Sequence, residues 1–250
     1  MRHLLTAFQF LTPFKIGKIR IVSDEGLAKS MAWFGIVGLS IGIALAGAYL
    51  LLNLFLPKVV VSVFIVLLMV IFSRGLHLDG LADTADGIAG GPLAGAGKDK
   101  ADMLRIMHDP NIGAIGAAAI FICLLLKFGC IYSIQSPVKA LIVSSVLSRW
   151  AFVFSATKWR PAPDNDGMGS KFIKFAGRKE LFWSTLTMFL TAIFMLGFKG
   201  IVIVIFAALF ISIFNNFIKN KISGLTGDTL GAVGEAVECF SLVVISALTK

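Results

Sequence analysis

Residues Ile36 to Leu56 read IVGLSIGIALAGAYLLLNLFL, and the only notably polar side chains among them are those of Ser40 and Asn53. Shortly afterwards, Val59 to Phe72 form a second apolar block that only Ser62 interrupts. A helix needs about 20 apolar residues to cross a hydrocarbon core about 30 Å thick. The two blocks therefore predict membrane-spanning helices.

The composition of the whole chain agrees with this prediction. Of its 250 residues, 57% are hydrophobic and 15% are charged, and the mean hydropathy is +0.89. A soluble domain usually carries about 25% charged residues, so this chain has too few of them to solvate the surface of such a domain. The composition excludes a disordered chain and argues against a soluble globular enzyme.

We expect one all-α domain over residues 1–250, a polytopic bundle of about seven membrane-spanning helices. The predicted spans cover residues 31–56, 57–76, 112–134, 138–157, 181–198, 200–218 and 231–249. Residues 1–30 form an N-terminal segment, and Met1–Phe14 within it predicts an amphipathic helix that lies either at the membrane interface or packed against the bundle. The polar residues concentrate in an acidic loop at 77–111, a loop at 158–180 and a glycine-rich segment at 219–231.

The distribution of charge predicts how the bundle is oriented. Of the 23 Lys and Arg residues, 16 fall on one side of the predicted spans, four on the other and three within or at the edge of spans. The positive-inside rule assigns the rich side to the cytoplasm. All 14 carboxylates also fall on that side or within reach of it, although the rule does not act on them. We therefore expect a multi-pass protein of the cell membrane whose site faces the cytoplasm and needs carboxylates.

The densest polar motif is HLDGLADTADG, from His77 to Gly87, which directly continues the second predicted span. Asp79, Asp83 and Asp86 stand at i, i+4 and i+7, so on a helix they share one face. Three like charges repel one another at a membrane boundary unless something compensates them. A hard cation with oxygen ligands, Mg²⁺ or alternatively Mn²⁺, is the simplest compensation. The alternative is a solvated acidic helix end.

Two arginines are candidate phosphate ligands. Asp102, Arg105 and Asp109 follow at spacings of three and four residues, so they also share a helical face. Arg105 could bind a phosphate through two parallel hydrogen bonds, or it could form an ordinary surface ion pair with Asp102. Arg149, near the end of the fourth predicted span, could hold phosphate or extend to the interface.

The third motif is GLTGDTLG, from Gly224 to Gly231, which leads into the last predicted span. Thr226, Gly227 and Thr229 would present hydroxyls and backbone N–H groups at a helix start, a combination that suits phosphate. Asp228 either caps this helix or supplies another metal ligand. Glu235 and Glu238 follow inside an apolar helix, where carboxylates are usually functional.

A membrane site of carboxylates, arginines and glycine-rich N–H donors fits metal-assisted transfer of a phosphoryl or phosphodiester group. The polar loop between Arg160 and Lys179 could close over a substrate. The residues by themselves thus predict a metal-dependent transferase that acts on a diphosphate.

The motifs together resemble the cobalamin synthase family, also called the adenosylcobinamide-GDP ribazoletransferases. The resemblance rests on His77–Gly87, Arg105–Asp109, Gly113, Gly116, Gly227–Ala232 and Phe10–Pro13. It implies the last assembly step of the cobamide pathway, in which α-ribazole or its 5′-phosphate is joined to adenosylcobinamide-GDP and GMP is released. The cofactor that it implies is Mg²⁺. The implied partners are the two substrates and the lipid bilayer, with no nucleic acid, and the oligomeric state is left open, a homo-oligomer included.

Roles follow from the resemblance position by position. Asp79, Asp83 and Asp86 match the acidic motif and are expected to bind metal. The residues expected to contact substrate or phosphate are Arg105, Arg149, Asp102, Asp109, Thr226, Gly227 and Thr229. The expected catalytic groups, any of which could take the proton of the attacking hydroxyl, are His77, Asp86 and Asp228.

Two other functions remain as alternatives. A CDP-alcohol phosphotransferase of phospholipid synthesis also presents spaced aspartates to Mg²⁺, but its motif resembles Asp-Gly-x-x-Ala-Arg, whereas Asp83 and Thr84 stand here. A cation or substrate transporter would place polar residues near the middle of the membrane and charge on both sides. Cation flux without any nucleotide substrate would favour the transporter.

Overall fold

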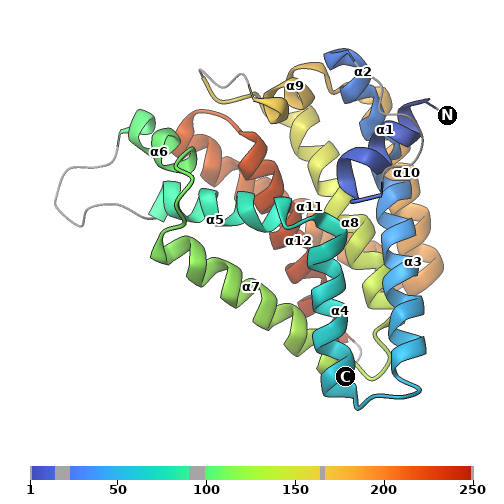
Figure 1. Cartoon of the computed structure of the whole chain (residues 1–250). Coiled ribbons are helices and arrows are strands. Elements are labelled where there is room, and N and C mark those ends of the chain that lie inside the picture. Colours follow the sequence, from blue (N-terminus) through green and yellow to red (C-terminus); the bar gives the residue numbers. More distant parts are fainter. Residues whose placement is uncertain (1, 15–22, 90–98, 164–166, 249–250) are drawn as a thin grey trace.

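The computed structural model of the chain describes residues 2–14, 23–89, 99–163 and 167–248. These residues form α-helices, one short 3₁₀ helix and an isolated bridge between Pro161 and Leu225. In chain order the helices are α1 (Arg2–Leu11), α2 (Asp24–Lys29), η1 (Ser30–Trp33), α3 (Phe34–Leu52), α4 (Lys58–Ser73), α5 (Leu76–Ala89), α6 (Lys100–Met107), α7 (Ala114–Ser133), α8 (Val138–Lys158), α9 (Met168–Phe175), α10 (Arg178–Leu196), α11 (Phe198–Ile222) and α12 (Gly227–Leu248). Figure 1 shows their arrangement.

Six helical segments are long and apolar enough to cross a membrane, and they coincide with six of the predicted spans. They are Asp24–Leu52, which joins α2, η1 and α3, and the helices α7, α8, α10, α11 and α12. Helix α8 is the centre of the bundle, because 89% of its most apolar stretch of 18 residues is buried against its neighbours. It packs against α3, α10 and α12.

The second predicted span is not a straight helix that continues into the acidic motif. Helix α4 ends at Ser73, and α5 leaves it at an angle of 87° (Figure 1). The break is made by Arg74 and Gly75, whose φ values of 54° and 70° lie in the left-handed region. Two successive residues in that region cannot continue a right-handed helix. The prediction of a direct continuation is therefore wrong, and within the described residues a seventh candidate span exists only as this bent pair.

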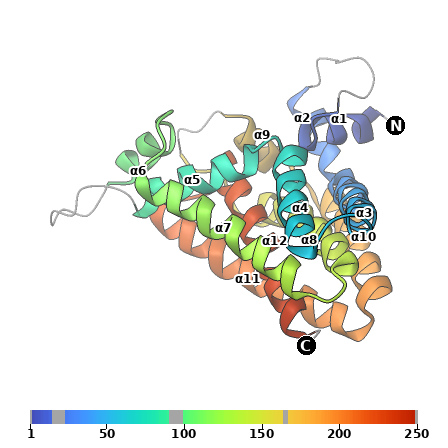
Figure 2. The same cartoon turned by 60° about the horizontal axis from the view of Figure 1, so that its bottom comes forward.

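The acidic segment predicted as a loop at 77–111 consists mainly of helices. Helix α5 continues through Gly87, Ile88 and Ala89, and α6 follows from Lys100 to Met107. Residues 90–98 lie outside the described part of the chain. Helix α5 packs against α7 and α12, and both views show it crossing the bundle beside them (Figure 1, Figure 2).

Gly80 allows α5 and α12 to cross closely. A Cβ at this position would lie 2.6 Å from the carbonyl oxygen of Asp228 in the first turn of α12. Only glycine avoids this clash, so the close crossing depends on Gly80. The crossing brings the acidic motif of α5 beside the glycine-rich motif that starts α12.

The predicted N-terminal helix is confirmed as α1, and its position supports packing against the bundle. Ala7 and Leu11 are 0% and 2% exposed. The helix contacts η1 and α3 at one end of the bundle, far from the last turns of α12 (Figure 1, Figure 2).

Candidate functional site

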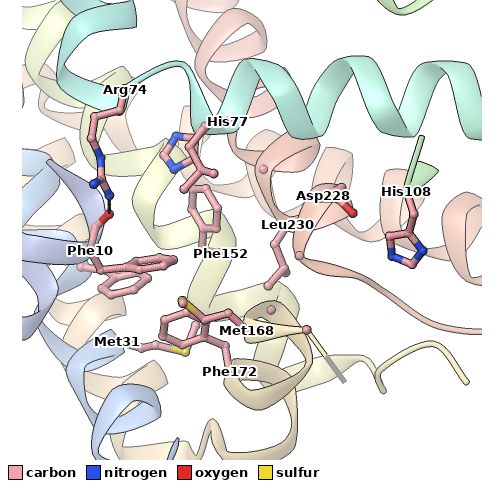
Figure 3. Close-up of a pocket in the computed structure, with 16 residues that line it drawn as sticks. Phe10, Met31, Arg74, His77, His108, Phe152, Met168, Phe172, Asp228 and Leu230 are labelled. Carbon is pink, nitrogen blue, oxygen red and sulfur yellow. Dashed lines mark hydrogen bonds between the residues drawn. The ribbon is translucent and has the colours of Figure 1, made fainter. Parts of the chain in front are cut away.

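Two adjoining cavities lie where α5, α12 and the segment after α6 meet. The larger cavity, which we call the aromatic chamber, has a volume of about 460 Å³ and is drawn in Figure 3. Its walls are mostly apolar and include Phe10, Met31, Phe34, Phe152, Met168, Phe172 and Leu230, with Arg74, His77, His108 and Asp228 as the charged or titratable side chains. A largely apolar cavity with a few converging polar groups is the usual form of a small-molecule site.

The smaller cavity, which we call the acidic pocket, has a volume of about 300 Å³. Asp79 and Asp83 of α5, Asp109 after α6 and Asp228 of α12 line it together with His108. His108 and Asp228 also line the aromatic chamber, and Figure 3 shows these two side chains directed toward one another. The two cavities therefore form one site with an apolar part and an acidic part.

Asp109 is fixed at the rim of the acidic pocket. Its Oδ1 accepts hydrogen bonds from the backbone N–H of Asn111 at 2.9 Å and from the Asn111 side-chain amide at 2.8 Å. These bonds, the backbone one first, lower the pKa of the Asp109 carboxyl below its ordinary value. Asp109 is therefore a charged acceptor at neutral pH.

The donor chemistry of the acidic pocket fits Mg²⁺ that arrives with a diphosphate. Within the described residues, no three His, Cys, Asp or Glu side chains form a group that could hold a metal ion by themselves. Mg²⁺ is usually held by one or two carboxylates, with water and substrate phosphates as its other ligands. Asp79, Asp83 and Asp228, which line one cavity, offer carboxylates of this kind.

Asp86 has a different position from the other two aspartates of its motif. It is buried, and its two oxygens accept hydrogen bonds from the backbone N–H groups of Gly113 at 2.7 Å and Gly116 at 2.8 Å. These donors lie at the start of α7, where the helix dipole favours a negative charge. Asp86 does not line the acidic pocket. The geometry therefore supports an anchoring role for Asp86 rather than the predicted metal-binding or catalytic role.

The two predicted phosphate-binding arginines do not line the site. Arg105 and Asp102 are exposed and form an ion pair of 3.3 Å on α6, as the surface alternative predicts. Arg149 is 3% exposed and donates to Glu238 at 3.1 Å, so it neither reaches the cavities nor extends to the interface. The structure instead places Arg74 in the chamber wall, where its guanidinium donates to the carbonyl of Phe10 at 2.9 Å (Figure 3).

The predicted phosphate-binding threonines are used in the local structure that starts α12. The backbone N–H of Thr226 donates to Thr229 Oγ1 at 2.8 Å, and the N–H of Thr229 donates to Thr226 Oγ1 at 3.2 Å. Both side chains are fully buried, so their hydroxyls cap the helix rather than face a ligand. Gly227 lies in the wall of the aromatic chamber, beside Gly167 and Gly169 from the loop predicted to close over a substrate. Residues 164–166 of that loop lie outside the described residues.

A buried ion cluster formed by Lys127, Arg149, Glu235 and Glu238 lies behind the chamber. Lys127 Nζ is 2.5 Å from Glu235 Oε2 and 2.6 Å from Glu238 Oε2. All four side chains are 3% or 4% exposed. Sequence reasoning singled out the two glutamates but missed their pairing with Lys127. A lysine within an apolar span is itself a signal, because such a charge requires a partner.

His77 connects the buried ion cluster to the chamber. Its ring lines the chamber and lies 4.7 Å, centroid to centroid, from that of Phe152. On the other side, His77 Nδ1 is 4.0 Å from Glu235 Oε1, and this nitrogen has no hydrogen-bond partner within the described part of the chain. The structure thus places this predicted catalytic residue in the site, whereas His108, which lines both cavities, was missed as a site residue.

Comparisons with known proteins identify the family. The model of the CobS family, described as cobalamin-5-phosphate synthase, matches residues 3–246. The chain is 33% identical to the adenosylcobinamide-GDP ribazoletransferase of Caldanaerobacter subterraneus subsp. tengcongensis, with 99% of each protein covered. The proteins of the same name from Geotalea daltonii and Clostridium kluyveri are 31% and 32% identical, with at least 98% of each chain covered. No solved structure matches the chain. A match over nearly the whole length, to the family model and to full-length relatives alike, places this chain in the cobalamin-5-phosphate synthase family.

Proposed function

We propose that this chain joins α-ribazole, or its 5′-phosphate, to adenosylcobinamide-GDP in the final step of cobalamin assembly. Family membership makes it a transferase of cobalamin biosynthesis, and its relatives carry the name of this reaction. The observation that supports the reaction at this site is the continuity of the aromatic chamber with the acidic pocket. A substrate that carries an apolar ring system and a diphosphate needs an apolar cavity for the first and an acidic cavity, which can hold a metal ion, for the second.

The proposed reaction exchanges one bond to phosphorus for another. The ribazole hydroxyl forms a bond to the cobinamide-side phosphorus, and the bond from that phosphorus to the bridging oxygen breaks. GMP leaves with the electron pair, and the hydroxyl proton passes to a base of the protein. Asp228 and His108, at the junction of the two cavities, are the bases that we favour, and His77 is a third candidate.

The acidic pocket would hold the diphosphate through Mg²⁺, with Asp79 and Asp83 as the protein ligands. The ion, when bound, would neutralise negative charge on the phosphate oxygens. Arg74 would contact a phosphate from the chamber side, because its guanidinium carries more donors than the one bonded to Phe10.

The aromatic walls would bind the flat base of the ribazole. Phe10, Phe34, Phe152 and Phe172 come from different helices and surround one cavity. Aromatic rings prefer stacked or edge-to-face contact with another ring, and each such contact contributes about 0.5–1.5 kcal/mol. Their burial would also exclude water from the reacting phosphorus.

We propose that the site faces the cytoplasm. The excess of Lys and Arg on the side of the polar segments supports this orientation. The sequence alternatives, a CDP-alcohol phosphotransferase and a transporter, have no support among the relatives found.

The experiment that tests this proposal is an assay of purified protein in liposomes with adenosylcobinamide-GDP, α-ribazole and Mg²⁺. We expect release of GMP matched by a cobalamin product, and loss of both with EDTA. Asp83→Asn should lower turnover by about 100-fold or more, the scale of losing a charge-stabilising group. Asp102→Asn, an exposed carboxylate outside both cavities, is the matched control and should leave turnover within about two-fold of the unmodified protein, as for a surface substitution. Folded protein that turns over CDP-diacylglycerol, or nothing at all, would refute the proposal.

A further inference from the structure

A third cavity, of about 470 Å³, lies where α8 and α11 end. We call it the basic pocket, because its charged side chains are Lys158, Arg160 and Lys219 and its lining includes no described carboxylate. None of these three cations forms an ion pair with a carboxylate in the described part of the chain. Like charges around one cavity repel one another, so an anion bound between them would relieve the repulsion.

The walls of the basic pocket are held in place by hydrogen bonds. Trp159 Nε1 donates to Asn216 Oδ1 at 3.0 Å and thereby ties the end of α8 to α11. The backbone N–H of Leu225 donates to the carbonyl of Arg160 at 3.0 Å. On the rim, Lys100 Nζ donates to Ser223 Oγ at 2.7 Å and adds a fourth positive charge. These hydrogen bonds therefore fix the shape of the pocket.

The position of the pocket favours a lipid as the source of the anion. Lys158 and Lys219 lie in the last turns of α8 and α11, both long and apolar enough to cross a membrane. Along α11, the pocket residue Ser212 is followed toward the interior of the span by Leu209 and Ile205, three and seven residues earlier on the same face. These two side chains are 53% and 62% exposed. An apolar track thus leads away from the cations, as an acyl chain would require.

We propose that the basic pocket binds the phosphate of an anionic phospholipid whose acyl chains lie along α11. Basic pockets between membrane-spanning helices are suited to such headgroups. The hydrogen bond from Leu225 to the pocket residue Arg160 links the pocket to the chain three residues before Asp228, so the lipid would also support the segment that starts α12. This inference does not depend on the transferase reaction, because lipid binding is measured without substrate.

The test is native mass spectrometry of the full chain in detergent with phosphatidylglycerol or phosphatidylcholine added. The test variant is Lys158→Gln/Lys219→Gln, and the matched control is Arg178→Gln/Lys179→Gln, which removes the same charge at the start of α10. We expect the test variant to bind phosphatidylglycerol about 30-fold more weakly, from the usual contribution of two basic residues at a membrane surface. The control should bind as the unmodified protein does, and phosphatidylcholine should bind weakly to all three.

Three outcomes would overturn the proposal. The first is equal retention of phosphatidylglycerol by both variants, and the second is an equal loss in both, since either would show that the pocket does not select the lipid. The third is displacement of the lipid by inorganic phosphate at equal concentration, which would show that the pocket takes a free phosphate. Unchanged melting temperatures of the variants would show that the substituted proteins are folded, as expected for exposed lysines.

Discussion

Replacing Lys127 by Met tests whether the buried ion cluster is charged and stabilises the bundle. The substitution removes two contacts, of 2.5 Å to Glu235 and 2.6 Å to Glu238. Only Arg149, 3.1 Å from Glu238, then remains to compensate two carboxylates. The cluster changes from neutral to a net charge of one negative unit in a site that is at most 4% exposed.

The expected cost follows from this burial. Breaking a buried ion pair by removing one partner costs about 3–5 kcal/mol. A carboxylate at the centre of a membrane helix costs about 2.5–3.5 kcal/mol on the insertion scale. We therefore expect the free energy of unfolding to fall by about 3 kcal/mol, which for a chain of this size lowers the melting temperature by about 6–12 °C.

The assay is thermal unfolding in one detergent at constant pH, arranged as a double-mutant cycle with Glu235→Gln. Each single substitution leaves the cluster with a net charge of one unit, whereas the double variant leaves the neutral pair of Arg149 and Glu238. The double variant should therefore be more stable than the sum of the single effects predicts, by about 2 kcal/mol. Lys139→Met, at an exposed position at the start of α8, is the control and should change stability by less than about 0.5 kcal/mol. Additive effects in the cycle, or an unchanged melting temperature for Lys127→Met, would refute the reasoning.

Three further predictions concern the site. Gly80→Ala should lower both activity and melting temperature, because its Cβ would lie 2.6 Å from a carbonyl oxygen of α12, whereas Gly47→Ala, with no atom within 4 Å, should change neither. Asp86→Asn should lower the melting temperature by a few degrees, because it weakens the hydrogen bonds that Asp86 accepts at the start of α7, and such a cap contributes about 1 kcal/mol. If Asp86 instead acts in the active site, the variant should lose activity with unchanged stability. Arg74→Gln should raise the KM for adenosylcobinamide-GDP by about 10-fold with a smaller change in kcat, as expected for a lost charged hydrogen bond. The control Arg178→Gln, at the start of α10 and outside the chamber, should leave that KM unchanged.

Much of the fold could be predicted because length and apolar content alone identify a membrane-spanning helix. The bend between α4 and α5 could not, since nothing in the local pattern shows that Arg74 adopts a left-handed conformation, which is uncommon for a residue other than glycine. Helical spacing placed Asp79 and Asp83 on one face, and the structure brings both to one pocket. The same spacing also predicted Asp86 to lie with them, although Asp86 contacts the start of α7 instead. Periodicity gives the face of the helix but does not show which neighbouring element a side chain contacts.

The rest of the candidate site depends on contacts between distant parts of the chain. Lys127 and Glu235 are 108 residues apart in the sequence, so no local pattern joins them. The rings of Phe10, Phe34 and Phe152 come from three helices and meet only after the bundle has formed. In an apolar chain with many phenylalanines, the sequence around a ring that lines a cavity looks the same as the sequence around a ring that faces lipid.

The early end of α4 has a consequence for the bilayer around the protein. Its 16 residues span about 24 Å at 1.5 Å per residue, which is less than the hydrocarbon thickness of about 30 Å. Helix α11, with 25 residues, is long enough to cross the same membrane. If α4 crosses the hydrocarbon core by itself, it is too short for it, and the bilayer beside α4 and α5 is then expected to thin so that the aspartates of α5 reach water. Lipids with shorter acyl chains should therefore favour access of the polar substrate to the site.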